Sequence, residues 1–238
     1  MNIIEQGLLQ GDSLELLTTL PKNFFQLILA DPPYEISRPN NFTGIGRQGI
    51  DFGDWDKNFN QLSWIDLAAP LLKPGGSIVI FNDWKKLGDI AKHLESLKFN
   101  SMRPIIWHKS NPAPFNGKYM FLQSTEFAIW ATKKKKGKNS KTVFNSKYHH
   151  GIFNYSNNNS KKKGATGVKH PTKKSLDMFQ EIIRILTNPN DWVLDPFLGS
   201  GTTAVACKKT GRNVIGIEKD PNFYKMGLDN WTQAKFES

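Results

Sequence analysis

The amino-acid sequence predicts an α/β domain whose sheet is mostly parallel and is covered by helices on both faces. Short apolar runs alternate with amphipathic segments along most of the 238 residues, which is the pattern of strand–helix–strand units. A glycine-rich turn lies between a strand and a helix near the C-terminus, and only 20 residues follow the next strand, which ends at Glu218. The other strands must therefore come from earlier sequence, so we expect a circularly permuted strand order.

In the first half of the chain, apolar periodicity distinguishes helices from buried strands. Leucines at helical spacing over residues 11–20 indicate a helix that Pro21 ends. Residues 26–30 (QLILA) indicate a buried parallel strand that ends at Asp31. Residues 35–56 are rich in Gly and Asn without periodicity, so we expect a long loop. The remaining predictions here are a helix over 62–72, a turn at 73–76, a strand over 77–81 and a helix over 85–97.

The second half continues the alternation. Two β-rich runs flank a loop that contains Asn-Pro, and an amphipathic segment follows the lysine-rich region. The predicted strands are 104–109, 126–132, 192–197 and 213–220, and the predicted helices are 175–187 and 202–211.

The positive charge of the chain is concentrated in one segment. The net charge is +11, from 32 basic and 21 acidic side chains. Thirteen lysines and no Asp, Glu or Arg lie between Lys133 and Lys174, and their removal leaves 19 basic against 21 acidic side chains. Such a segment is typical of a surface that binds a polyanion, with a solvated lysine-rich loop as the alternative. We therefore expect an α/β domain of residues 1–132 and 170–238 and a polyanion-contacting insertion of residues 133–169.

Composition excludes several other classes of protein. No apolar run approaches the roughly 20 residues that a membrane helix needs, and the first residues (MNIIEQGLLQGD) lack the basic and apolar regions of a signal peptide. We therefore expect a cytoplasmic protein. The single cysteine, Cys207, excludes an internal disulfide and a multi-thiolate zinc site. No carboxylate cluster accompanies His149 and His150, so no metal site is expected.

The glycine-rich turn over residues 199–204 (GSGTTA) predicts a nucleoside-cofactor site. It follows a predicted strand and opens a predicted helix, so that backbone N–H groups can face a ligand without obstruction by side chains. Glu218 ends the next strand, where a carboxylate can accept hydrogen bonds from both ribose hydroxyls. A plain strand-to-helix turn with a surface glutamate is the alternative.

NAD is a rival cofactor, because the same spacing fits a dinucleotide site with Ala204 in the last glycine position. The position of the turn argues against NAD, since the 20 residues after Glu218 are too few for the remaining strands of a dinucleotide domain.

The tetrapeptide Asp31-Pro32-Pro33-Tyr34 stands at the carboxyl end of a predicted buried strand, where open α/β sheets place their ligands. The two prolines restrict the backbone and carry no N–H, so the segment offers oxygen acceptors beside an aromatic ring. This combination suits a planar heterocycle with an exocyclic amine, whose hydrogens the acceptors hold while the ring stacks. Acceptors would also stabilise the positive charge that develops on the amine when it attacks. A plain loop after a strand is the alternative.

The tetrapeptide and the segment DPFLGSGTT at 195–203 together resemble the S-adenosylmethionine-dependent amino-methyltransferases of DNA. The order of tetrapeptide, lysine-rich region and cofactor loop is similar to that of the beta class. The resemblance spans Gly11 to about Phe223 and implies a circularly permuted, Rossmann-like methyltransferase fold. Further segments that agree are GDSLELL at 11–17, KPGG at 73–76, WHKSNPAP at 107–114 and HPTKKS at 170–175.

The resemblance implies a role for each residue of these motifs. Asp31 and the Pro32 carbonyl would hold the target amine, Pro33 would complete the rigid tetrapeptide, and Tyr34 would stack on an extruded base. The family often has a proline after the lysine of HPTxK, whereas Ser175 follows Lys173 and Lys174 here, so the resemblance assigns no contact to these two lysines. The S-adenosylmethionine site would be formed by Asp12 near the adenine, Glu218 at the ribose, His170 and Thr172 at the methionine end, and Asp195, Phe197, Gly199, Ser200, Gly201 and Thr202 between them.

The implied reaction is direct, in-line transfer of the sulfonium methyl to the N6 amine of a flipped adenine in double-stranded DNA. DPPY rather than SPPY favours adenine N6 over cytosine N4 by family habit. Cys207 lies in the helix after the glycine turn, where we expect it to pack, which argues against a cytosine C5 enzyme with a cysteine nucleophile.

Several alternatives stay open at this point. They are a cytosine N4 enzyme, a methyltransferase of RNA or of a protein side chain, an NAD enzyme, and a DNA-binding module without a cofactor. Residues 35–56 would either close over the base or be a plain surface loop. The sequence does not reveal the recognition sequence, and it leaves open both a homodimer, which is frequent in this class, and a cognate restriction endonuclease.

Overall fold

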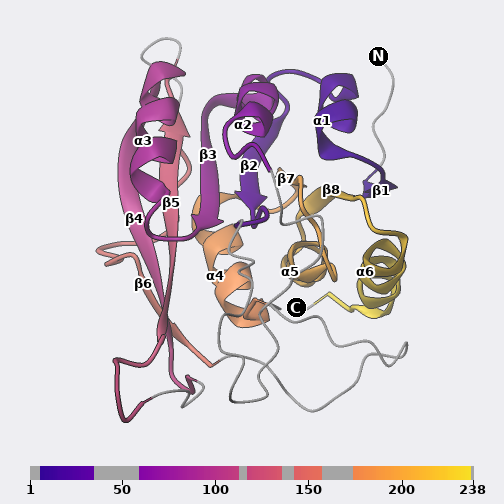
Figure 1. Cartoon of the computed structure of the whole chain (residues 1–238). Helices are drawn as coiled ribbons and strands as arrows, with labels where there is room; N and C mark the ends of the chain where they lie inside the picture. The colour runs from indigo at the N-terminus through magenta and orange to yellow at the C-terminus, as the bar shows by residue number, and fades with distance from the viewer. Residues whose placement is uncertain (1–5, 35–58, 113–116, 136–141, 157–173, 237–238) are drawn as a thin grey trace.

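The computed structural model describes residues 6–34, 59–112, 117–135, 142–156 and 174–236 (Figure 1). These residues form an eight-stranded sheet in the order β1-β8-β7-β2-β3-β5-β4-β6. The predicted loop 35–56, Lys161 to Lys163, Lys173, His170 and Thr172 lie outside the described residues. The strands are β1 Gly7–Gln10, β2 Phe25–Ala30, β3 Leu72–Asn82, β4 Phe99–Lys109, β5 Thr125–Lys133, β6 Ile152–Tyr155, β7 Trp192–Asp195 and β8 Asn213–Glu218.

The sheet is mostly parallel, as the sequence predicts. Strand β5 alone runs against its neighbours β3 and β4, and every other pair in the described sheet is parallel. The carboxyl ends of β2, β3, β4, β7 and β8 consequently lie along one edge of the sheet, where ligand sites of open α/β sheets are found.

The strand order is permuted. Strands β7 and β8 come from the end of the chain, yet they lie between β1 and β2 in the sheet (Figure 1). Leu27 of β2 pairs with Val193 of β7, and Leu9 of β1 pairs with Ile217 of β8. This arrangement confirms the expectation that the early part of the chain completes the sheet, and it brings the ends of β2 and β7 side by side.

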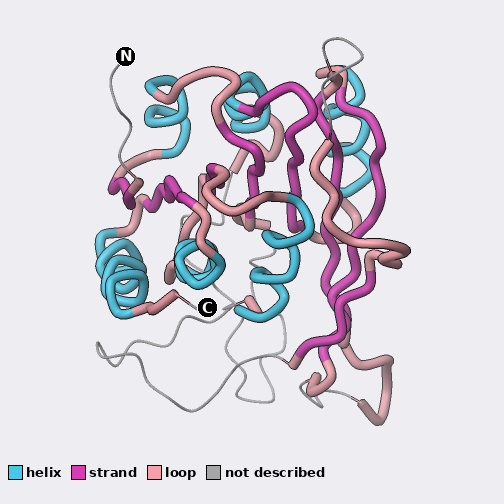
Figure 2. The backbone as a smooth tube through the Cα atoms, turned by 180° about the vertical axis from the view of Figure 1, so that it is seen from behind, coloured by secondary structure: helices cyan, strands magenta, loops and turns pink. Residues whose placement is uncertain are grey.

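Helices cover both faces of the sheet (Figures 1 and 2). Alternate residues of β2 point to opposite faces, because successive side chains of a strand alternate: Leu27 packs with α4 and α5, whereas Ile28 packs with α2 and α3. The helices on the first face are α4 Leu176–Leu186, α5 Thr202–Thr210 and α6 Pro221–Gln233, and those on the second are α1 Ser13–Leu16, α2 Ser63–Ala68 and α3 Leu87–Ser96. None of the helices in the described ranges has the length and apolarity to cross a membrane.

The predicted turn at residues 73–76 lies inside β3 as a bulge. Phe25 pairs with Leu72, whereas Leu27 pairs with Ser77, so the intervening residues of β3 are looped out of register. Gly75 has φ 82°, and a Cβ on Gly76 would lie 2.9 Å from the Lys73 carbonyl oxygen, so the bulge needs its two glycines.

Three elements were not predicted: β1, β6 and α6. Strand β6 comes from the lysine-rich segment and pairs with β4, and its Phe153 is buried in the core. Residues 152–155 of that segment are therefore built into the edge of the sheet. The helix α6 has a clear start signal, since the Asp220 side chain caps its first turn and Pro221 occupies its first position.

Candidate active site

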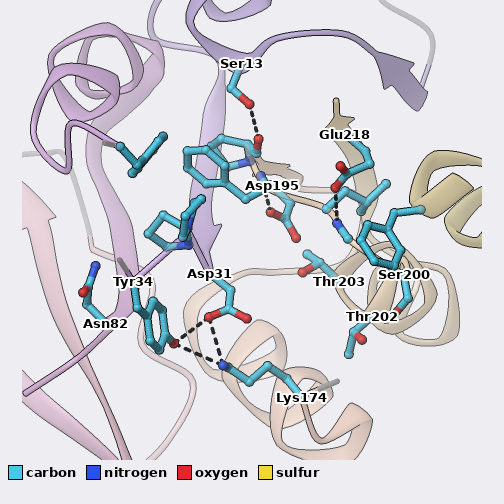
Figure 3. A pocket seen from close by; sticks show the side chains of 18 of the residues that line it. Ser13, Asp31, Tyr34, Asn82, Lys174, Asp195, Ser200, Thr202, Thr203 and Glu218 are labelled. Atoms are coloured by element: carbon cyan, nitrogen blue, oxygen red, sulfur yellow. Dashed lines mark hydrogen bonds and ion pairs between the residues drawn. The ribbon is translucent and has the colours of Figure 1, made fainter. Parts of the chain in front are cut away.

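The carboxyl ends of β2, β3, β7 and β8 open onto a single cavity of about 1160 Å³ (Figure 3). The cavity is lined by the whole tetrapeptide at 31–34 and by residues 195–200 of the glycine-rich segment. Thr202, Glu218 and Asp12 also line it. The two motifs that the sequence separates widely therefore face the same space.

Asp31 follows the last residue of β2 and is held by two hydrogen-bond donors. The Tyr34 hydroxyl donates to Asp31 Oδ1 over 2.6 Å, and Lys174 Nζ lies 2.9 Å from the same oxygen. Lys174 Nζ also donates to the Tyr34 hydroxyl oxygen over 3.1 Å, which closes a triangle of polar groups (Figure 3). No donor among the described residues binds Asp31 Oδ2, so this oxygen remains available in the cavity.

Lys174 is a buried cation, with only 5% of its surface exposed. Its second carboxylate partner is Glu126 of β5, at 2.8 Å, and Glu126 in turn pairs with Lys109 of β4 at 2.6 Å. Burial opposes the charge of Lys174, but the negative charges of Asp31 and Glu126 outweigh it and raise the pKa of Lys174 well above its usual value. Two lysines and two carboxylates thus form one compensated cluster.

Glu126 was not predicted as a site residue. Burial would raise its pKa, but the charges of Lys174 and Lys109 outweigh burial and lower the pKa of Glu126 to about 2. It lines the cavity and is charged at neutral pH. The signal in the sequence was a glutamate near the start of an otherwise apolar strand, which calls for a partner when it is buried.

The tetrapeptide is fixed from two sides. Burial raises the pKa of Tyr34 well above its usual value, and the charge of Asp31 adds to the rise, so Tyr34 is a neutral donor. Gln61 Nε2 donates to the Pro33 carbonyl, and Asn82 Nδ2 donates to Gln61 Oε1 over 2.7 Å. Asn82 ends β3 and lines the cavity, so the end of the neighbouring strand holds the tetrapeptide in place.

The glycine-rich turn connects β7 to α5. Gly201 caps α5 with φ 86°, and a Cβ at this position would lie 2.8 Å from Gly227 Cα in α6. Glycine is therefore required twice over, by the left-handed conformation and by the close approach. The structure places Gly201 behind the wall of the cavity, whereas Gly199, Ser200 and Thr202 form that wall.

Glu218 ends β8, and its carboxylate holds the turn. Gly199 N–H donates to Glu218 Oε2 over 2.7 Å, and Asp220 N–H donates to Oε1 over 2.8 Å. Burial raises the pKa of Glu218 although these hydrogen bonds oppose the rise. The carboxylate therefore lies against the backbone that a nucleoside ligand would approach.

Asp195 is a buried carboxylate at the end of β7, with 3% of its surface exposed. It accepts a hydrogen bond of 2.9 Å from Phe197 N–H, but no lysine or arginine of the described residues forms an ion pair with it. Burial raises the pKa of Asp195 to about 7, and the charges of Asp31 and Glu218 add to the rise. A cationic ligand in the cavity would stabilise the ionised form of this carboxylate and lower its pKa, which fits a sulfonium cofactor.

Two other predicted cofactor residues have defined structural partners. Asp12 Oδ1 accepts from Leu14 N–H over 2.8 Å and caps α1, and its Oδ2 lies 2.9 Å from Lys219 Nζ. Phe197 packs edge-on against Trp64, with ring centroids 5.2 Å apart. Both residues line the cavity, so the adenine end that was predicted at Asp12 opens onto the same space as Asp31.

Cys207 is fully buried in α5, which confirms that it packs rather than reacts. Burial raises the pKa of its thiol, which opposes formation of a nucleophilic thiolate.

Comparison with known proteins agrees with this geometry. The family model described as DNA methylase, for N6 and N4 enzymes, matches residues 25–229. The chain is 35% identical over 237 residues to the type II methyltransferase M2.LlaDCHI of Lactococcus lactis subsp. cremoris, which covers 92% of this chain and 86% of the relative. It is 36% identical to M1.HpyAVI in the crystal structure of its complex with S-adenosylmethionine, with a TM-score of 0.73 and coverage of 95% and 98% of the two chains.

The cytosine-N4-specific PvuII DNA methyltransferase shares the fold as well, with a TM-score of 0.74 at 21% identity over 96% of this chain and 86% of that one. The fold is therefore compatible with a cytosine N4 target, and it does not by itself identify the target base of this chain.

Proposed function

The chain belongs to the DNA methylase family, and from this premise we propose that its target is the N6 amine of adenine in double-stranded DNA. It is an S-adenosylmethionine-dependent DNA methyltransferase. The cofactor supplies a methyl group on a positively charged sulfur. The observation that carries methyl transfer to an exocyclic amine is the single cavity shared by the acceptor corner at Asp31 and the glycine-rich turn. The choice of adenine N6 is supported by the resemblance of the tetrapeptide DPPY at 31–34.

Asp31 and Pro32 would receive the target amine. Asp31 Oδ1 already accepts two hydrogen bonds, which leaves Oδ2 and the Pro32 carbonyl as acceptors for the two amine hydrogens. An exocyclic amine is a poor nucleophile because its lone pair is delocalised into the ring, and fixed acceptors stabilise the positive charge that develops on attack. The positive charge of Lys174 beside Asp31 would oppose the positive charge that develops on the amine. Glu126 offsets the charge of Lys174, and the cluster of two lysines and two carboxylates is neutral as a whole.

The opposite side of the cavity would hold the cofactor. Glu218 and the Gly199 backbone would bind the ribose of S-adenosylmethionine, and Asp12 would lie at the adenine ring of the cofactor. Asp195 would lie near the positively charged sulfur of the cofactor. His170 and Thr172, outside the described residues, are proposed for the methionine end from the resemblance alone. In this arrangement Tyr34 presents its ring beside the extruded base while its hydroxyl holds Asp31.

The lysine-rich segment is proposed to contact the DNA backbone. Its 13 lysines without an acidic neighbour suit a polyanion, and its described part joins the sheet through β6. The relatives include proteins named type II methyltransferases. We therefore propose that this chain also has a cognate restriction endonuclease. A DNA substrate would place the activity at the nucleoid, and a homodimer is proposed on the habit of the class.

Methylation of unmethylated genomic DNA with methyl-labelled S-adenosylmethionine tests the proposal. The DNA is digested to nucleosides, the labelled base is identified, and sequencing of methylated positions gives the recognition sequence. N6-methyladenine is expected. N4-methylcytosine would instead establish the second candidate target, for which the family model also allows. No transfer of label to either base of the DNA would contradict the function.

A further inference from the structure

Two exposed aromatic side chains stand at the mouth of the catalytic cavity. Trp84 is 63% exposed and Phe121 is fully exposed, and both line the cavity that contains Asp31. Large apolar side chains in this position are costly in water unless something covers them. We call this pair the aromatic rim.

The topology of the sheet places the aromatic rim. Trp84 is two residues beyond the end of β3, and Phe121 lies in the connection between β4 and β5. This connection leaves from the edge at which β2 ends, because β4 is parallel to β2 and β5 returns from the same edge. Figure 1 shows it projecting beyond the carboxyl ends of the strands.

The stem of the connection is ordered by backbone hydrogen bonds. Lys109 N–H donates to the Ser124 carbonyl over 2.7 Å, and Ser124 N–H donates to the Leu122 carbonyl over 2.8 Å. Phe121 is exposed although the next residue, Leu122, is hydrogen-bonded to Ser124, which is itself hydrogen-bonded to β4. Its side chain is presented to whatever approaches the cavity.

Exposed lysines adjoin exposed aromatic residues in the two chain segments that carry the rim. Lys85 and Lys118 are exposed next to Trp84 and Tyr119, and Lys85 Nζ lies 5.7 Å from the centre of the Trp84 ring. Tyr119 itself is 88% exposed. Exposed aromatics between lysines suit nucleic acid, in which bases stack and phosphates pair, whereas lysine is depleted at protein–protein interfaces.

We propose that the aromatic rim inserts into the DNA base stack beside the target adenine and takes over the stacking that the adenine loses when it leaves the helix. This inference rests on the proposed function and extends it to the extrusion step. Apolar wedges that enter a base step offset the cost of unstacking, which is a few kcal/mol for a paired base. The rim is placed for this role because Trp84 and Phe121 are exposed and line the same cavity as Asp31.

The test compares two duplexes that carry the recognition sequence, one with the target adenine paired and one with it opposite an abasic site. In the second duplex the adenine has no pairing partner to leave, so extrusion costs less. Phe121→Ala is expected to lower kcat/KM on the paired duplex by about tenfold or more, and much less on the unpaired one. Phe121→Trp should keep the wild-type ratio of the two rates, because tryptophan also presents a large ring that can enter the base stack.

Phe236→Ala is the matched control, since Phe236 is 63% exposed, as Trp84 is, but lies outside the cavity. Binding of S-adenosylmethionine should be unchanged in all variants. An equal loss on both duplexes, or no loss, would overturn the inference while leaving the function intact. The inference would also be overturned if Phe121→Ala left the ratio of the two rates unchanged and converted a dimer to a monomer. That result would assign the rim to a protein interface. A wild-type enzyme that methylates neither duplex would overturn the proposed function itself.

Discussion

Lys174 Nζ lies 2.9 Å from Asp31 Oδ1, so the residue that precedes the cap of α4 holds the carboxylate that follows β2. The contact joins the two ends of a chain segment that contains four of the eight described strands, β3, β4, β5 and β6. Because Lys174 also pairs with Glu126 at 2.8 Å, the position of Asp31 depends on a residue of β5 that does not touch it. The geometry of the acceptor corner is thus set by a buried cluster of charges rather than by the tetrapeptide alone.

Replacement of Lys174 by methionine should destabilise the protein strongly. It leaves the partly buried carboxylates of Asp31 and Glu126 without the buried cation that they share, and loss of one partner of a buried pair costs about 3–5 kcal/mol. Urea unfolding of the variant measures this cost. Lys73→Met is the matched control, because the Lys73–Asp191 pair is partly exposed at 3.8 Å and should contribute about 1 kcal/mol or less. Equal effects of the two substitutions would show that the cluster does not hold the fold together.

Asp195 should make stability fall as pH rises. Its pKa is about 7 in the folded protein, against about 3.9 in an unfolded chain, so between these pH values the folded state keeps a proton that the unfolded state has released. Asp195→Asn removes the contribution. The free energy of unfolding of the variant minus that of the wild type should therefore be larger at pH 7.5 than at pH 4.5, which means that the variant gains stability relative to the wild type as pH rises. A difference that does not change with pH would mean that Asp195 is ionised over the whole range.

Gly201→Ala should damage the glycine-rich turn. A side chain at φ 86° costs about 1–2 kcal/mol, and the new Cβ would lie 2.8 Å from Gly227 Cα, so the turn and α6 must separate. We expect loss of both stability and affinity for S-adenosylmethionine, measured by thermal unfolding and calorimetry. Gly88→Ala in α3 is the control, since a Cβ there meets nothing within 4 Å and alanine favours the helix. The prediction fails if the two variants bind the cofactor equally well.

Replacement of Lys161, Lys162 and Lys163 by alanine should flatten the dependence of DNA affinity on salt. Each lysine that neutralises a phosphate contributes about −0.9 to the slope of log K against log [salt] on duplex DNA. Titrations of a labelled duplex at several salt concentrations measure the slope for the variant and the wild type. An unchanged slope would identify the segment as a solvated loop that does not touch the DNA.

The sequence predicted the parts of the fold that local pattern determines. The buried strand ending at Asp31 and the glycine turn ending at Gly201 are both found, because their apolar runs and breakers act on neighbouring residues. Strands β1 and β6 were missed since each has four residues and its pairing depends on distant strands. The helix α6 could have been predicted from Asp220 and Pro221.

The acceptor and cofactor motifs were predicted, but the residues that position them were not. Glu126, Gln61 and Asn82 hold the acceptor corner through contacts between distant parts of the chain, and no spacing in the sequence encodes such contacts. The exposed position of Phe121 was equally hidden, because an aromatic residue in a loop gives no sign of which cavity it faces.

The most direct measurement compares methyl transfer and cofactor binding in Asp31→Ala. If Asp31 receives the target amine at one end of the cavity and S-adenosylmethionine binds at the other, the variant should lose about 10²-fold or more in methylation rate while its affinity for the cofactor stays that of the wild type. Methylation near the wild-type rate would contradict the assignment of Asp31. A parallel loss of cofactor affinity would place Asp31 in the wrong half of the cavity.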